Sequence, residues 1–229
     1  MALINLTEVK TFLGISLAST TEDGFLGLVI NAVDAEAKKY FDRQIETATY
    51  TDEYYCGTNN HILCLNEYPV TSVTSVRIDE SGFWGTVSGS FATATALTSG
   101  VDYALVKDGR NGVAETGRLW RINGVWPARL ESKHGALNAM VKPGPGNIKV
   151  TYVAGYASGA IPQDIKLGLW QVVTQIRAAK GKGWPVDSES LGEYSYSLAA
   201  MAVEYLRTGT VASQLARYRR VRQRFTVLG

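Results

Sequence analysis

The chain has 229 residues, of which 45% are hydrophobic and 19% are charged. This apolar content is enough to fill a core, which excludes disorder for the whole chain, and the charged fraction lies below the roughly 25% typical of soluble domains. The formal net charge is +2, but residues 205–229 carry +6 while residues 1–204 carry −4. The sequence therefore joins a thinly charged, mildly acidic body to a basic C-terminal end.

Nothing in the sequence predicts a membrane or secretory destination. No apolar run reaches the roughly 18 residues needed to cross a bilayer, and the N-terminus lacks the basic and apolar regions of a signal peptide. Cys56 and Cys64 are the two cysteines, too few for a disulfide framework. We expect a soluble, unsecreted chain with no membrane partner.

The N-terminal third predicts two helices. Residues 5–13 form the first, with Asn5 as the capping residue and Glu8 three positions later. Thr21 is expected to cap a longer helix, which carries apolar residues at helical spacing and runs to about Phe41.

The middle of the chain changes to β-branched and aromatic residues broken by Gly and Asn, which is typical of strands and turns. Residues 47–56 and 61–65 predict a hairpin, and residues 70–79 a strand, although its first three valines are spaced by three rather than alternating. Residues 81–100 favour a long surface loop or an exposed hairpin. Further strands are expected at 101–106, 117–122 and 147–153.

Helical spacing returns after Pro162 and continues to about Ala179. The remainder predicts a linker at 186–197, a short helix at 198–206, and a last helix from Val211 to about Arg224 capped by Thr210. The fold class is therefore α+β, with a small helical core (N-terminal helices plus helix 163–180), a β-rich insertion and an extended C-terminal helical arm. The expected parts are residues 1–46, 47–156 with the long insertion 80–146, 157–185 and 186–229.

Candidate metal and catalytic residues are few. Cys56, His61 and Cys64 are soft ligands within nine residues, but a closed zinc site needs a fourth ligand, and His134 lies 70 residues away. The two histidines have no nucleophile-elbow motif beside them, and Gly181-Lys182-Gly183 lacks the span of a phosphate-binding loop. The pairs Glu22/Asp23 and Glu189/Glu193 fit helix capping and solvated loops better than acid-base chemistry. We predict a protein that is no enzyme, with no cofactor and no metal.

The strongest local signal is the arginine-rich segment Arg217–Phe225. Three interpretations stand beside one another. It is a solvated terminal helix whose arginines interact with its own dipole, a nucleic-acid contact that combines phosphate-binding charge with stacking rings, or a docking helix rich in Arg and Tyr. An apolar stripe at helical spacing, formed by Val211, Leu215, Tyr218 and either Val221 or Arg222, favours a partner groove.

Four blocks in order give the sequence a resemblance to a known family. They are Tyr40-Phe41-Asp42-Arg43 with Tyr68–Val76; Ile148–Tyr156 followed by Ile161–Ile165; Glu189–Ser197; and Leu215–Arg220. Together they cover about residues 3–79 and 147–222. In these blocks the chain resembles the head-tail connector (adaptor, or head completion) proteins of tailed bacteriophages.

That resemblance implies a homo-oligomeric ring, typically dodecameric, beneath the portal protein in the virion. The ring would extend the DNA channel, pass genomic DNA without specific binding, attach a stopper or tail component, and assemble in the host cytoplasm. It also implies a portal-docking arm, carried here by Leu215, Arg217, Tyr218, Arg219, Arg220, Arg222, Arg224 and Phe225. Insertion 80–146 is longer than compact members need, and residues 198–210 depart from the family pattern. The alternative is a DNA-binding protein that uses the Arg-rich C-terminal helix.

Overall fold

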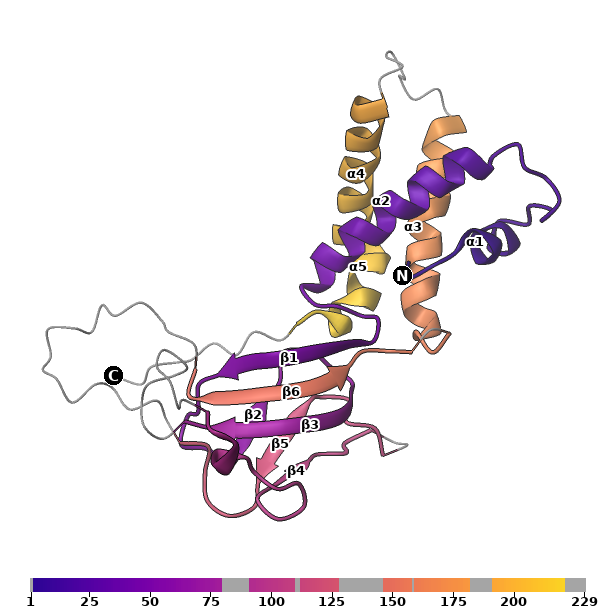
Figure 1. Cartoon of the computed structure of the whole chain (residues 1–229). Coiled ribbons are helices and arrows are strands. Elements are labelled where there is room, and N and C mark those ends of the chain that lie inside the picture. Colours follow the sequence, from indigo (N-terminus) through magenta and orange to yellow (C-terminus); the bar gives the residue numbers. More distant parts are fainter. Residues whose placement is uncertain are drawn as a thin grey trace, which may run out of the picture. The chain divides into compact units, whose positions relative to one another are not determined.

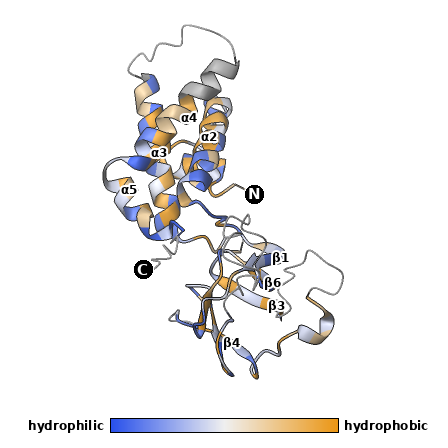
Figure 2. Cartoon of the chain, turned by 90° about the vertical axis from the view of Figure 1, so that its left-hand side faces the viewer, coloured by the Kyte–Doolittle hydropathy of each residue, from blue (hydrophilic) through white to orange (hydrophobic). Residues whose placement is uncertain are grey.

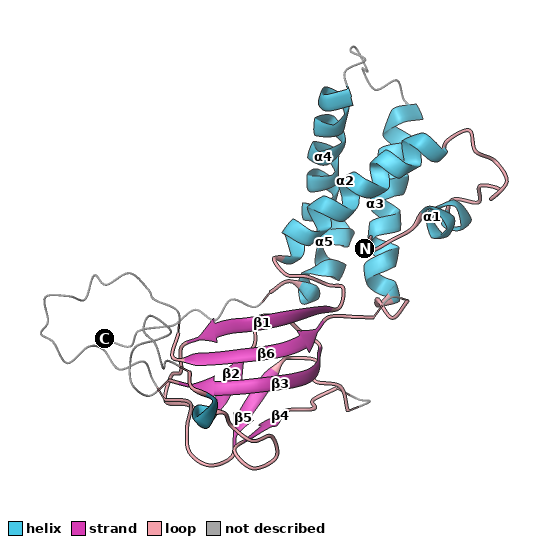
Figure 3. Cartoon of the chain, viewed as in Figure 1, coloured by secondary structure: helices cyan, strands magenta, loops and turns pink. Residues whose placement is uncertain are grey.

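The chain folds as an α+β protein with two compact units (Figures 1 and 3). The computed structural model describes residues 2–79, 91–109, 112–127, 146–157, 159–181 and 191–220. One unit, the helical unit, combines Met1–Glu46 with Ala157–Gly229, and the other, the β unit, spans Thr47–Tyr156. Among the described residues, no helix has both the length and the apolar character of a membrane span.

The helical unit is built around three longer helices that lie side by side (Figure 1). Its elements are α1 (Leu6–Phe12), α2 (Asp23–Phe41), α3 (Gln163–Gly181), α4 (Leu191–Arg207), α5 (Gly209–Leu215) and the short 3₁₀ helix η2 (Ala216–Tyr218). Each long helix carries both hydrophobic and hydrophilic residues along its length (Figure 2). The apolar positions meet in a core that includes Leu26, Val29, Val33, Leu169, Val172, Ile176, Leu198, Leu206, Val211 and Leu215.

The N-terminus of α1 is capped as predicted, whereas that of α2 is not. At α1 the Glu8 backbone N–H donates to Asn5 Oδ1 at 2.9 Å, and the Asn5 N–H donates to Glu8 Oε2 at 3.3 Å, so the predicted capping box is confirmed. The prediction that Thr21 caps α2 is wrong, because Glu22 occupies the N-cap position. Glu22 forms no side-chain cap bond there and instead pairs with Arg177 on α3 at 2.8 Å.

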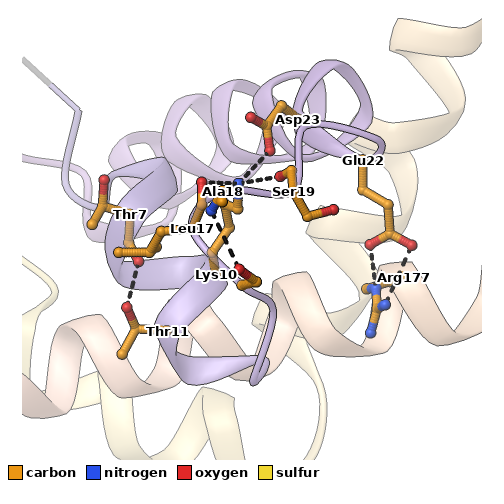
Figure 4. A network of polar contacts seen from close by, with 10 residues as sticks. Thr7, Lys10, Thr11, Leu17, Ala18, Ser19, Glu22, Asp23 and Arg177 are labelled. Atoms are coloured by element: carbon orange, nitrogen blue, oxygen red, sulfur yellow. Dashed lines mark hydrogen bonds and ion pairs between the residues drawn. The ribbon is translucent and has the colours of Figure 1, made fainter.

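A buried lysine holds the turn between α1 and α2 (Figure 4). Lys10 is 3% exposed, and its Nζ donates to the carbonyls of Leu17 and Ser19 at 3.2 and 2.5 Å and to Asp23 Oδ1 at 2.8 Å. The single cation therefore satisfies two loop carbonyls and the carboxylate in the first turn of α2.

We expect Lys10→Met to lower the free energy of unfolding of the helical unit by about 1–3 kcal/mol, because three acceptors lose a charged donor. Lys39→Met is the matched control: Lys39 is 70% exposed and pairs with Glu36 within one helix, so its loss should cost less than about 0.5 kcal/mol. Denaturant unfolding followed by circular dichroism measures both. Equal effects for the two variants would contradict the role assigned to Lys10.

The described residues of the β unit form two three-stranded antiparallel sheets around one core. The first has the order β1-β6-β3 and the second the order β2-β5-β4. The strands are β1 (Ala48–Tyr55), β2 (Ile62–Cys64), β3 (Val70–Ile78), β4 (Tyr103–Leu105), β5 (Arg118–Arg121) and β6 (Ile148–Ala154), with the 3₁₀ helix η1 at Thr93–Thr95. Their shared core includes Leu63, Val76, Leu119, Trp126, Ile148, Val150 and Tyr152.

The predicted hairpin of residues 47–56 and 61–65 is wrong. Strand β1 pairs with β6, and β2 pairs with β5 in the other sheet. The turn residues therefore lead the chain from one sheet to the next, and Gly57 permits a close crossing, since a Cβ there would lie 2.0 Å from the Pro127 carbonyl oxygen. The strands predicted at 101–106, 117–122 and 147–153 are confirmed as β4, β5 and β6.

The pairing of β3 with β6 explains why the valines of β3 are three residues apart. Its register against β6 shifts between Val70 and Ser72 and again between Val73 and Ser75. Each shift is a bulge that places one extra residue in β3, so residues three apart face the same side. Val70 and Val76 are consequently buried, and Val73 packs against the same core.

The insertion 80–146 contributes β4 and β5, the greater part of the second sheet, although residues 80–90, 110–111 and 128–145 lie outside the described part. The exposed loop expected at 81–100 is described only from Phe91, which is itself buried at 4% exposure.

The prediction of an extended C-terminal arm is wrong for residues 191–220, most of which lie in helices of the helical unit. Helix α4 already begins at Leu191, within the expected linker, and the last helix ends at Leu215 rather than Arg224. Its N-cap position is Thr208, not Thr210, and Arg219 is extended at φ −68° and ψ 148°. Of the apolar stripe that predicted an external groove, Val211 and Leu215 are buried against the chain's own helices at 2% and 0% exposure and Tyr218 is half-buried, while Val221 lies outside the described residues.

Candidate functional site

Three segments far apart in the sequence meet at the C-terminal end of α2. Asp42 follows this helix with a left-handed backbone, φ 53°, so the chain turns away and leaves the last carbonyls open. The Arg220 backbone N–H donates to the Phe41 carbonyl at 2.8 Å, and Arg219 Nε donates to the Tyr40 carbonyl at 3.2 Å. Positive charge is favourable beside these carbonyls because they form the negative end of the helix dipole.

Tyr218 is held through its hydroxyl and its backbone carbonyl. Its hydroxyl lies 2.8 and 2.7 Å from the two carboxylate oxygens of Asp164, in the first turn of α3. Its carbonyl accepts a hydrogen bond from Nε of the buried Arg43 at 2.7 Å. Arg217 forms an ion pair with the same carboxylate of Asp164. Asp164 therefore binds two consecutive side chains of the C-terminal end.

Helix α5 anchors this end to α3. Leu215 is fully buried, and a Cβ added at Gly168 would lie 3.1 Å from Leu215 Cδ2, so the glycine makes room for the leucine. The Tyr40 hydroxyl donates to the Ala212 carbonyl at 3.0 Å. We name Leu215–Arg220 the C-terminal segment, and Tyr40, Phe41, Arg43 and Asp164 the receiving site.

Of the predicted docking residues that the structure describes, one is buried, two are exposed, and Tyr218 and Arg220 are half-buried. Leu215 belongs to the core, while the Arg217 side chain is 66% exposed and Arg219 is also exposed. The Arg219 guanidinium lies 5.1 Å from the Tyr40 ring centre, in the geometry of a cation–π contact. Arg222, Arg224 and Phe225 lie outside the described residues. Their assignment to docking stays a prediction.

Sequence reasoning did not find the receiving site. Tyr40, Arg43 and Asp164 lie in the resembling blocks, but no local pattern assigned them a role. The one usable signal was the opposite charge of the two parts of the chain, +6 at the end and −4 in the body. This charge difference predicts attraction between them but does not identify the partner residues.

The candidate metal ligands do not form a site in the described part of the chain. Cys56 is exposed, Cys64 lies in β2, and the His61 ring stacks on Trp120 with centres 5.3 Å apart. No three His, Cys, Asp or Glu side chains there are grouped to hold a metal ion. His134 and Glu189 lie outside the described residues.

Two buried tyrosines and one half-buried carboxylate form a cluster in the β unit. The Tyr152 hydroxyl donates to Glu53 Oε2 at 2.5 Å, and the Tyr55 hydroxyl binds the same oxygen. Backbone N–H groups of Asn66 and Glu67 donate to the two hydroxyls at 3.0 and 3.2 Å. Burial, reinforced by the neighbouring Tyr152 and Glu53, raises the pKa of Tyr55 well above its usual value. Burial and the bond to Glu53 do the same to the pKa of Tyr152.

We expect the β unit to lose stability as the pH rises above about 10, because unfolding then releases protons that both buried hydroxyls retain in the folded state. Below that pH both residues are neutral in either state, and the stabilisation is complete. Above it, the loss approaches about 1.4 kcal/mol per pH unit for each tyrosine. Tyr152→Phe should reduce this slope by about the 1.4 kcal/mol per pH unit that one tyrosine contributes, because it removes one of the two hydroxyls.

Denaturant titrations at several alkaline pH values, with tyrosinate absorbance recorded in parallel, measure this slope. Titration of all the tyrosines near pH 10 in the folded protein would contradict the account.

Comparison with known proteins gives a weak structural similarity. Neither a protein-family model nor a curated protein matches the sequence. Among solved structures, the chain is similar to one from the neck of an empty gene transfer agent particle computed with C6 symmetry, with 14% identity, a TM-score of 0.45, and coverage of 96% of this chain and 90% of the other.

A chain from the neck of the native particle, computed with C12 symmetry, has 14% identity and a TM-score of 0.45, and the match covers 95% of this chain and 88% of the other. A chain from the virion of the native particle has 15% identity and a TM-score of 0.44, and the match covers 96% of this chain and 90% of the other. At these values the similarity carries no inference about function.

Proposed function

We propose that this protein is a structural adaptor subunit of a phage head-tail connector. It forms a ring under the portal that extends the DNA channel and provides the attachment site for the next tail or stopper component. Docking on the portal is assigned to the C-terminal end, through Arg217 and Arg219 together with Arg222, Arg224 and Phe225. The protein acts by assembly rather than by catalysis.

The observation that carries this proposal is the placement of the resembling blocks. In the β unit, Tyr68–Val76 supplies most of β3 and Ile148–Tyr156 supplies β6, and these strands pair. In the helical unit, Tyr40–Arg43, Ile161–Ile165 and Leu215–Arg220 meet at the receiving site. Apart from Glu189–Ser197, to which none of these contacts belongs, the blocks are therefore contact partners within each unit, which supports a shared architecture with the adaptor family.

The charge distribution fits the same role. Residues 205–229 carry +6 without a single carboxylate. Arginine and aromatic residues are enriched where proteins bind one another. An arginine-rich end is therefore suited to a protein partner, while the net negative charge of residues 1–204 is compatible with a channel that does not bind DNA.

Electron microscopy of the purified chain mixed with portal rings of the same phage tests the proposal. We expect class averages in which the portal ring gains a second coaxial ring with an open centre. Portal rings that remain unchanged at micromolar concentrations of the chain would contradict it. Absence of rings from the chain alone does not bear on the proposal, because such subunits can assemble on their partner.

The exposed guanidinium groups of Arg217 and Arg219 favour one alternative, a DNA-binding protein that uses the Arg-rich C-terminal end. Such a protein would bind duplex DNA with an affinity that falls steeply with salt, about as the power of the number of phosphates contacted. Fluorescence anisotropy with duplex DNA at low and moderate salt separates the two functions. The adaptor function predicts no such binding.

A further inference from the structure

The C-terminal segment occupies the chain's own receiving site, where Asp164 binds two of its side chains, those of Arg217 and Tyr218. We propose that Asp164 is a latch that holds residues 216–220 on the helical unit, and that its opening releases Arg217 and Arg219 together. The inference that opening promotes docking rests on the proposed function. The latch itself is a property of the isolated chain.

The contacts divide into a permanent anchor and a weaker closure. Leu215 and Val211 are buried in the core, so α5 has a large apolar area to keep it in place. Beyond Leu215 the segment is a single 3₁₀ turn followed by extended backbone, and short 3₁₀ turns have poor hydrogen-bond geometry. The point of opening is therefore the junction after Leu215.

The contacts that hold residues 216–220 closed are electrostatic, so salt can screen them and a charged partner can compete with them. The side chains of Arg217 and Asp164 are 66% and 32% exposed, so their ion pair is strongly screened and contributes little by itself. The hydrogen bond from the Tyr218 hydroxyl to the same carboxylate is charge-assisted, and it is the stronger of the two contacts. Loss of the Asp164 charge weakens both at once, without changing any residue of the segment.

Opening has a consequence for charge. Residues 216–229 contain five arginines and no acidic residue. In the closed state Arg217 pairs with Asp164, and Arg219 lies on the α2 carboxyl end with its guanidinium over Tyr40. Release frees the Arg217 and Arg219 guanidinium groups from these intramolecular partners. A docking partner that binds Arg217 therefore competes with Asp164 for the same side chain.

Hydrogen exchange of the Arg220 amide measures the latch without any partner. This N–H is bonded to the Phe41 carbonyl at 2.8 Å, so it exchanges when the segment opens. We expect Asp164→Asn to speed its exchange about tenfold, with Tyr218→Phe giving a smaller increase of the same sign. Glu204→Gln, which removes an exposed charge from α4, is the matched control and should leave the exchange unchanged.

Salt gives a second readout that a merely structural role for Asp164 would not produce. Exchange of the wild-type Arg220 amide should accelerate as salt rises, while Asp164→Asn should respond little, because its ion pair is already absent. Unchanged exchange in Asp164→Asn, or equal salt dependence in both proteins, would overturn the latch. Exchange that rises equally across α3 and α5 would also overturn it, because that pattern indicates general unfolding.

The consequence for docking is measured separately with portal rings. Asp164→Asn should bind them severalfold more tightly than the wild type, and Glu204→Gln should bind as the wild type does. Faster exchange with unchanged or weaker portal affinity would overturn the competition between partner and latch. If the wild type itself does not bind portal, the proposed function fails, and the exchange experiment still decides the latch.

Discussion

Leu215→Ala is expected to lower the free energy of unfolding of the helical unit by about 2–5 kcal/mol. The side chain is fully buried, and it fills the space that Gly168 leaves on α3. Truncation removes the transfer free energy of the lost methyl and methylene groups and leaves a cavity that the glycine cannot fill. The result would establish that α5 belongs to the core, although the apolar stripe predicted an external partner for it.

The control for this prediction is Leu28→Ala on α2. Leu28 is the same residue type in a helix of the same unit, but it is 39% exposed, so its replacement should cost well below 1 kcal/mol. Urea denaturation of both variants gives the comparison. A cost for Leu215→Ala no larger than that for Leu28→Ala would mean that α5 is detached in solution.

Two truncations of the C-terminal end are expected to behave differently. Removal of residues 211–229 deletes Val211 and Leu215 from the core and the partners of Arg43, Asp164 and the α2 carboxyl end. We expect it to destabilise the helical unit by more than Leu215→Ala does, because the cavity term is joined by buried polar groups left without partners. Removal of 221–229 takes away three of the predicted docking residues and none of the described contacts, so stability should change little.

Thermal unfolding of the two truncated proteins separates these expectations. Loss of portal binding by the longer truncation alone says nothing about docking, since the fold is affected too. The shorter truncation is the informative one. Equal stability of the longer truncation and the full chain would contradict the packing of α5 and η2.

Much of the fold could be predicted because local chemistry settles it. The capping box at Asn5 and the apolar spacing of α2 and α3 depend on residues close in sequence. Strand β3 could be predicted from its composition, but the reason for its valine spacing could not, because the two bulges exist only against β6, about 80 residues away.

The failures share a physical cause. Two strands with a turn between them predict a hairpin, yet β1 and β2 each find a partner elsewhere in the chain, because pairing is decided by burial in the shared core. In the same way, an apolar stripe on a terminal helix does not reveal whose surface covers it. Leu215 is covered by the chain's own α3, and the residues that receive Tyr218 come from positions 43 and 164.

The central claim is that the C-terminal end carries this subunit to a portal ring. The most direct test is cosedimentation of portal rings with the full chain and with the chain lacking residues 221–229. The account predicts that the full chain sediments with the rings and that the shortened chain, equally folded, remains in the supernatant. Equal cosedimentation of the two proteins, or no cosedimentation of the full chain, would contradict it.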